Sequence, residues 1–153
     1  MRILVDGDAC PVKDEVFRVA RRCGLRVAVV ANSSIRIPAS PLFEMIVVGR
    51  GRLDAADDWI VEQADGRSIV VTTDIPLAAR CLEKGARVLD PKGRVFTQES
   101  IGDALASREL MAYLRDMGDS SGGPAPFEAR DRSRFLQRLD DLVQAALKAK
   151  ASR

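Results

Sequence analysis

The sequence predicts a three-layer, doubly wound α/β fold with a mainly parallel sheet and a helical cap at its C-terminal end. Short apolar runs rich in Val and Ile alternate with stretches of helical periodicity over residues 1–96. This alternation is typical of a parallel sheet that is covered on both faces. From residue 97 onward the sequence favours helix alone. We therefore expect one domain over residues 1–153, with an α/β core at 1–96 and a helical extension at 97–153.

Five short apolar runs predict the strands of this sheet. They lie at residues 3–5, 27–30, 45–48, 69–71 and 88–89. Their lack of polar alternation indicates burial on both faces. Right-handed crossovers between parallel strands would distribute the intervening helices over the two faces.

Amphipathic stretches predict the helices, at residues 12–23, 54–64, 75–84, 97–117 and 131–150. Gly24 ends the first as a C′ glycine, Thr97 suits the N-cap of the fourth, and we expect a break near Ser107. Residues 118–126 are rich in Gly, Ser and Pro and predict a flexible connection. The last helix carries an apolar stripe that must bury against the domain or a partner. Its members are Phe135, Leu139, Leu142, Val143 and Ala146.

The composition excludes several classes of catalyst. Histidine is absent, which excludes Ser-His-Asp and Cys-His catalysis and histidine-ligated zinc. Cys10, Cys23 and Cys81 are far apart and form no CxxC pair, so we expect them to pack rather than to bind zinc or form disulfides. The net charge of +2 predicts no strong nonspecific binding to nucleic acid. Catalysis would have to use carboxylates, lysines, hydroxyls or a metal ion held by carboxylates.

The apolar segments also bear on localisation. None reaches the roughly 20 apolar residues of a membrane span. The first strand runs directly into Asp6, without the apolar region of a secretory signal. We therefore expect a cytoplasmic protein with no membrane partner.

Aspartates follow the predicted strands at the sheet edge where α/β proteins bind ligands. Asp6 and Asp8 follow the first strand, Asp74 follows the fourth, and Asp54 and Asp57 open a helix. If the strands of Asp6 and Asp74 are neighbours, these carboxylates converge and repel one another unless a cation neutralises them. Mg²⁺ and Mn²⁺ prefer oxygen ligands. The sequence therefore predicts a divalent-metal site suited to phosphodiester hydrolysis.

Each of these aspartates also has a structural interpretation. An Asp at a strand end is often a turn residue, and Asp74 is well placed to cap the helix that follows it. Asp58 suits a solvated helix position.

Polar and basic residues near the predicted site could contact phosphate or sugar. They are Asn32, Ser33, Ser34, Arg36, Arg50 and Arg52. Ordinary solvated loops explain these residues equally well.

Several motifs, in order, resemble those of the bacterial YaiI/YqxD family over nearly the whole chain. They are Val5-Asp6-Gly7-Asp8-Ala9-Cys10-Pro11; Val30-Ala31-Asn32-Ser33-Ser34 with Arg36 and Pro38; Asp54-Ala55-Ala56-Asp57; Thr73-Asp74-Ile75-Pro76-Leu77-Ala78; and Gly122-Gly123-Pro124 with Asp131-Arg132 and Phe135. That family is in turn similar to PIN-like domains, in which acidic residues at the strand ends hold Mg²⁺ or Mn²⁺ for RNA cleavage.

The resemblance implies a PIN-like, metal-dependent ribonuclease with RNA as its partner. By that resemblance Asp6 and Asp74 are metal ligands, and Asp57 or Asp54 is the third. Asp8 would lie beside these ligands or serve a second ion. The catalytic set is then Asp6, Asp8, Asp57 and Asp74.

Other functions stay open. The chain could be a non-catalytic module that binds RNA or a protein, with a structural metal, and its C-terminal helices could form a homodimer. Asp6-Gly7-Asp8 also resembles the first motif of haloacid-dehalogenase-type phosphatases, in which Asp6 would be the nucleophile and Asp8 the acid/base. Cys10 stands where that motif has Thr.

Overall fold

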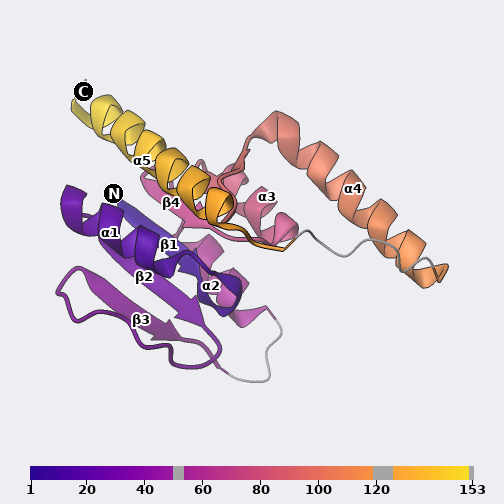
Figure 1. Ribbon diagram of the computed structural model, residues 1–153, viewed down its shortest axis with the longest axis horizontal. Helices are drawn as coiled ribbons and strands as arrows, with labels where there is room; N and C mark the ends of the chain where they lie inside the picture. The colour runs from indigo at the N-terminus through magenta and orange to yellow at the C-terminus, as the bar shows by residue number, and fades with distance from the viewer. Residues whose placement is uncertain (50–53, 119–125, 152–153) are drawn as a thin grey trace.

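Six strands form one sheet in the order β3-β2-β1-β4-β5-β6 in the computed structural model, which describes residues 1–49, 54–118 and 126–151 (Figure 1). The strands are β1 (Arg2–Asp6), β2 (Arg26–Ala31), β3 (Phe43–Val47), β4 (Ser68–Val71), β5 (Arg87–Leu89) and β6 (Val95–Phe96). The helices are η1 (Gly7–Ala9), α1 (Lys13–Cys23), α2 (Ala55–Gln63), α3 (Ile75–Glu83), α4 (Gln98–Asp116) and α5 (Ala129–Ala151).

The first five strands are parallel, and β1 lies at the centre of the strand order. Val5 pairs with Val29 of β2 on one side and with Val71 of β4 on the other. Only β6 is antiparallel, pairing with β5. The chain moves outward from β1 to β2 and β3 and then returns to β4, so the order reverses between β1 and β4. Crevices at such reversals are where doubly wound sheets bind ligands.

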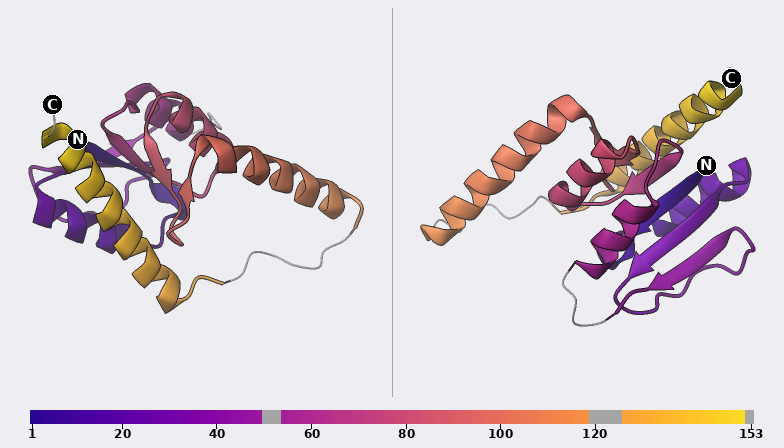
Figure 2. Two further views of the ribbon diagram at one scale, coloured as in Figure 1. Left: turned by 90° about the horizontal axis from the view of Figure 1, so that it is seen from above. Right: turned by 180° about the vertical axis from the view of Figure 1, so that it is seen from behind.

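Both faces of the sheet are buried under helices, which produces the predicted three layers. In β1, Ile3 and Val5 pack in one core with α1 and α5, whereas Leu4 packs in a second core with α2, α3 and α4. Figure 2 shows α1 and α5 on one side of the sheet and α2 and α3 on the other. The alternation follows from the two-residue period of a strand, because each strand must place apolar side chains on both faces.

Helix α5 completes the layer that α1 begins. The predicted stripe packs against the sheet, with Phe135, Leu139 and Val143 fully buried. Glu15 of α1, which is buried, accepts a hydrogen bond from Arg132 at 3.0 Å. Arg132 also donates to the Pro11 carbonyl at 2.9 Å. The start of α5 is therefore fixed beside the loop that follows β1.

The structure corrects two details of the sequence prediction. Helix α4 runs without a break through Ser107. Ser107 is exposed and flanked by strong helix formers, and a single serine costs such a helix only a few tenths of a kcal/mol. Strand β6 was not predicted, because two residues are too short to show a periodicity. The predicted α1 end is confirmed, with Gly24 in the left-handed conformation at φ +66°.

The predicted packing of the cysteines is largely confirmed. Cys10 and Cys81 are buried, and Cys23 is partly buried against the α1–α5 core. Burial raises the pKa of the Cys81 thiol to about 12, so this thiol stays protonated. No helix within the described ranges combines the length and the apolar character that crossing a membrane requires.

Candidate functional site

Asp6 ends the central strand at the carboxyl edge of the sheet. The Thr72 hydroxyl, just beyond the neighbouring strand β4, donates a hydrogen bond to Asp6 Oδ2 at 2.9 Å. Burial raises the pKa of Asp6, the Thr72 bond opposes this rise, and the charges of Asp74 and Asp8 add to it. Asp6 is thus a half-buried carboxylate with two acidic neighbours and one fixed oxygen.

Asp74 reaches the same edge from β4, and it also caps α3. Its Oδ1 accepts the Leu77 backbone N–H at 3.0 Å, so the structural role that the sequence allowed is present. The Asp74 N–H donates to the Thr72 hydroxyl at 3.0 Å. Thr72 therefore accepts from the Asp74 backbone and donates to the Asp6 carboxylate, so this buried hydroxyl connects the two aspartates.

Thr72 is a site residue that the sequence analysis did not single out. The available signal was its position as a polar residue directly after the buried run of β4. A buried hydroxyl requires hydrogen-bond partners, and here the partners are the two aspartates of the predicted site.

Asp57 lies in the first turn of α2, so the site residues come from three different parts of the fold. Burial raises its pKa to about 6, and the charges of Asp74, Asp6 and Asp54 contribute in that order, while Arg80 opposes them. The four aspartates therefore lie within electrostatic reach of one another. Asp54 occupies the N-cap position of α2, is exposed, and makes no side-chain capping bond.

Asp8 lies in the 3-10 turn after Asp6 and is exposed. Its Oδ2 accepts the Asn32 backbone N–H at 3.2 Å, which ties this turn to the end of β2. Gly7 makes the close approach possible, because a Cβ there would lie 2.8 Å from Val29 Cγ1 and 3.1 Å from the Val30 carbonyl oxygen. A side chain at residue 7 would thus displace the turn that carries both Asp6 and Asp8.

The remaining predicted contact residues are less closely tied to the aspartates. Asn32, Ser33, Ser34 and Arg36 follow β2 at the same edge and are exposed. Arg50 and Arg52 lie outside the described residues. Asp58 forms an exposed ion pair with Arg80 at 3.0 Å, in keeping with its predicted solvated position.

The donor set suits a hard divalent cation, but the carboxylates are not drawn together around a common point. Asp6, Asp57 and Asp74 offer only oxygen atoms, as Mg²⁺ and Mn²⁺ prefer. Across the described ranges, no three Asp, Glu or Cys side chains are gathered closely enough to enclose an ion as they stand. A shared ion would therefore require side chains of this set to move, and Asp57 is the one without a described hydrogen bond.

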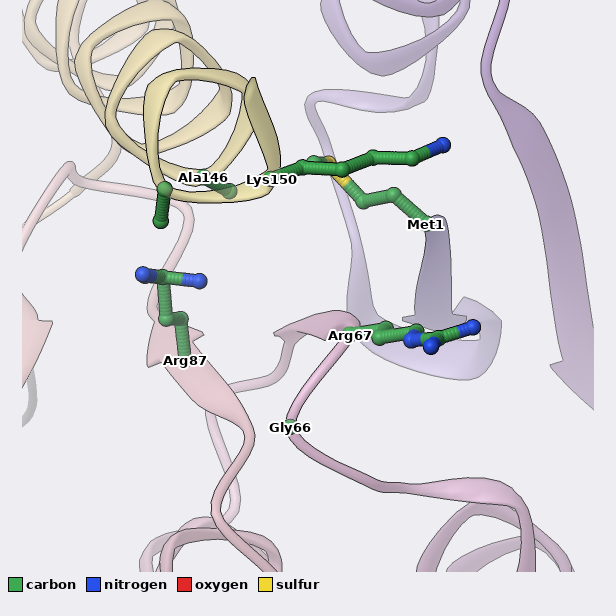
Figure 3. A pocket seen from close by; sticks show the side chains of 7 residues that line it. Met1, Gly66, Arg67, Arg87, Ala146 and Lys150 are labelled. Atoms are coloured by element: carbon green, nitrogen blue, oxygen red, sulfur yellow. The ribbon is translucent and has the colours of Figure 1, made fainter. Parts of the chain in front are cut away.

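A cavity lies at the opposite, amino edge of the sheet, beneath the end of α5 (Figure 3). Its volume is about 300 Å³. The side chains around it are cationic or apolar, and they come from Met1, Gly66, Arg67, Arg87, Ala146, Ala149 and Lys150. Since strands separate the two edges, this cavity does not belong to the aspartate site.

Comparison with known sequences identifies relatives over the full length of the chain. A protein named UPF0178 protein from Nitrobacter winogradskyi is 53% identical over 153 residues, covering 100% of this chain and 97% of the relative. Relatives of the same name occur in Rhodospirillum centenum, 57% identical over 94% of this chain and 95% of the relative, and in Sphingopyxis alaskensis, 59% identical over 90% of each. No solved structure matches the chain.

The profile of one protein family matches residues 4–145, and its description is "Uncharacterized BCR, YaiI/YqxD family". The match includes every aspartate of the candidate site and most of α5. It agrees with the motifs that the sequence carries from residue 5 to residue 135. The chain belongs to the YaiI/YqxD family.

Proposed function

We propose that this chain is a divalent-metal-dependent nuclease of PIN-like type that hydrolyses RNA phosphodiesters. The observation that carries the proposal is the position of Asp57. A partly buried carboxyl whose pKa rises to about 6 beside Asp74 and Asp6 is an unfavourable arrangement for an ionised group at neutral pH. Perturbed carboxyls at the carboxyl edge of a parallel sheet are typical of functional sites, and a cation relieves their repulsion.

Asp6, Asp74 and Asp57 would hold the ion, with Asp54 as a further oxygen donor at the start of α2. A bound Mg²⁺ or Mn²⁺ supplies a Lewis acid that stabilises charge on a phosphoryl group. Thr72 links the Asp6 carboxylate to the backbone of Asp74 through its two hydrogen bonds. Asp8 holds the turn against β2 through the Asn32 N–H, so it acts on Asp6 through position and charge.

A non-catalytic module is the second candidate, and the N-cap bond of Asp74 favours it. Because Asp74 stabilises α3, its presence at the strand end is explained without catalysis. In this alternative the aspartates hold a structural ion, and the chain binds RNA or a protein without cleaving it. Metal binding without turnover, with RNA retained by the Asp74→Asn variant, would favour the module over the nuclease.

The test is cleavage of single-stranded and structured RNAs in Mn²⁺, compared with EDTA. We expect the wild-type protein to cleave in Mn²⁺ alone and Asp6→Asn and Asp74→Asn to lose activity at least a hundredfold. Asp103→Asn, an exposed aspartate on α4, is the matched control and should cleave normally. Failure of the wild-type protein to cut any RNA in the panel would reject the nuclease. Hydrolysis of p-nitrophenyl phosphate lost in Asp6→Asn would instead point to a phosphatase.

We further propose that a second copy of the chain packs on the outer half of α4. This helix projects away from the sheet (Figures 1 and 2), and only its first half, with Ile101 and Ala104, is buried in the core. The outer half and the C-cap residue that follows it expose large apolar side chains, which are Leu110, Met111, Tyr113 and Met117. A self-complementary contact between two such helices is the simplest way to cover them.

A further inference from the structure

A basic groove lies at the same edge of the sheet as the aspartates, between α5 and the turn that joins β5 to β6. Its volume is about 600 Å³. Four of its residues are cationic and one is acidic; the lining comprises Asp90, Lys92, Gly93, Arg94, Val95, Arg134 and Arg138. The near-neutral net charge of the chain does not reveal this local excess.

The turn that forms one wall of the groove is rigid. Asp90 Oδ1 accepts the backbone N–H groups of Lys92 and Arg94, both at 2.9 Å. Gly93 has φ +86°, and a Cβ there would lie 2.9 Å from the Arg134 carbonyl carbon. At Gly93 the turn therefore packs directly against Arg134 of α5. The one acidic side chain of the groove is engaged within this turn.

The arginines of the groove come from both of its walls. Arg134 and Arg138 are four residues apart on α5, so they lie on the same face of that helix. The Arg94 guanidinium lies over the Phe96 ring, 5.3 Å from its centroid. Arg134 has one described ion pair, with Asp131 at 3.9 Å, which is a long contact. These guanidinium groups consequently keep donors available for a ligand.

Hydrogen bonds connect the groove to the aspartate site. Thr72, which donates its hydroxyl proton to Asp6, also donates its backbone N–H to the Leu89 carbonyl at 3.2 Å. Asp90 follows Leu89 directly and begins the wall of the groove. The groove thus starts one strand away from the strand that precedes Asp74 and two strands away from that of Asp6, on the same edge.

We propose that this groove binds the phosphodiester backbone of single-stranded RNA and directs it to the aspartates. The inference rests on the proposed function for the identity of the substrate. Guanidinium groups recognise phosphate by paired hydrogen bonds, and the three arginines that line the groove, Arg94, Arg134 and Arg138, would contact phosphates of one strand. Asp6 is recessed at the strand end, and an unpaired strand bends into such a position more readily than a duplex does.

The experiment measures binding without catalysis, by fluorescence anisotropy of a labelled mixed-sequence single-stranded RNA in EDTA. We expect Arg134→Gln/Arg138→Gln to raise the Kd on the order of tenfold. The slope of log Kd against log salt should fall by about 1.4, since each phosphate contact to a single strand contributes roughly 0.7. The matched control is Arg67→Gln/Arg87→Gln, which removes two positive charges from the cavity at the opposite edge and should leave the Kd within twofold. Arg94→Gln, on the other wall, should weaken binding severalfold.

Three results would overturn the proposal that the groove binds RNA. They are an absence of RNA binding by the wild-type protein, an equal loss of affinity in both arginine pairs, and displacement of the RNA by polyglutamate at RNA-like concentrations. Thermal unfolding of each variant tests whether a loss reflects misfolding, and the Arg94→Gln variant supplies an independent test from a different element. RNA binding through the groove without cleavage in Mn²⁺ would reject the nuclease and retain the groove.

Discussion

Replacing Asp57 with Asn should stabilise the metal-free protein near neutral pH. The Asp57 pKa rises from 3.8 to about 6 on folding, first through burial and then through Asp74 and Asp6. The folded state therefore holds the proton at pH values where the unfolded state has released it, and stability falls as the pH rises from 3.8 to about 6. Above this pH range the ionised carboxyl lowers the stability of the fold by its full amount, and below it the carboxyl is protonated and no stability is lost.

The size of the effect follows from the two pKa values. A difference of this size corresponds to about 3 kcal/mol, and partial exposure of Asp57 reduces it to about 1.5 kcal/mol. Asparagine has the same shape without the charge. Asp57→Asn should thus raise the free energy of unfolding by about 1.5 kcal/mol at about pH 7.5 and by about 0.3 kcal/mol at about pH 4.

Urea unfolding in EDTA at these two pH values measures the difference directly. Asp103→Asn, which removes an exposed charge on α4, is the matched control and should change little at either pH. Addition of Mn²⁺ near pH 7.5 should stabilise the wild-type protein more than Asp57→Asn, because the variant has lost one proposed ligand. An equal effect of Asp57→Asn at both pH values would refute the electrostatic argument for the site.

Three further changes test other parts of the structure. Gly93→Ala should destabilise the fold by about 1–3 kcal/mol in urea unfolding, because Gly93 has a positive φ and contacts α5. Gly102→Ala should stabilise the fold by up to about 1 kcal/mol in the same assay, because Gly102 faces open space on α4. Asp74→Ala should lower the free energy of unfolding by about 1 kcal/mol, because the N-cap bond to α3 is lost. Asp74→Asn should keep the free energy of unfolding in the same assay, but it should no longer bind metal in calorimetry. Leu110→Glu with Tyr113→Glu should convert a dimer into a monomer in light scattering; a wild-type monomer at high concentration would reject the contact through α4.

Local sequence patterns were sufficient to predict the layers and the edge on which the aspartates lie. Uninterrupted Val and Ile runs could be placed as parallel strands because such strands must be apolar on both faces. The pairing of β1 with β4 was a condition of the predicted site, and the structure meets it. This pairing brings residues 5 and 71 side by side, and no local pattern encodes it.

The parts that escaped prediction depend on tertiary contacts. Thr72 became a site residue only because its hydroxyl lies between two aspartates from different elements. The basic groove joins a turn to arginines about 40 residues further along the chain, and its existence depends on how α5 docks. Arg132 and Gly93 contribute to that docking, and no local sequence pattern indicates the partners that they contact.

A crystal of the wild-type protein soaked in Mn²⁺ tests the central claim most directly. We expect one anomalous peak at the carboxyl edge, within coordination distance of Asp6 and Asp74, with the Asp57 side chain rotated toward it. A soak of Asp74→Asn, which keeps the helix cap, should show no peak there. An ion bound elsewhere, or Asp6 and Asp74 too far apart to share one, would contradict the metal site and the nuclease built on it.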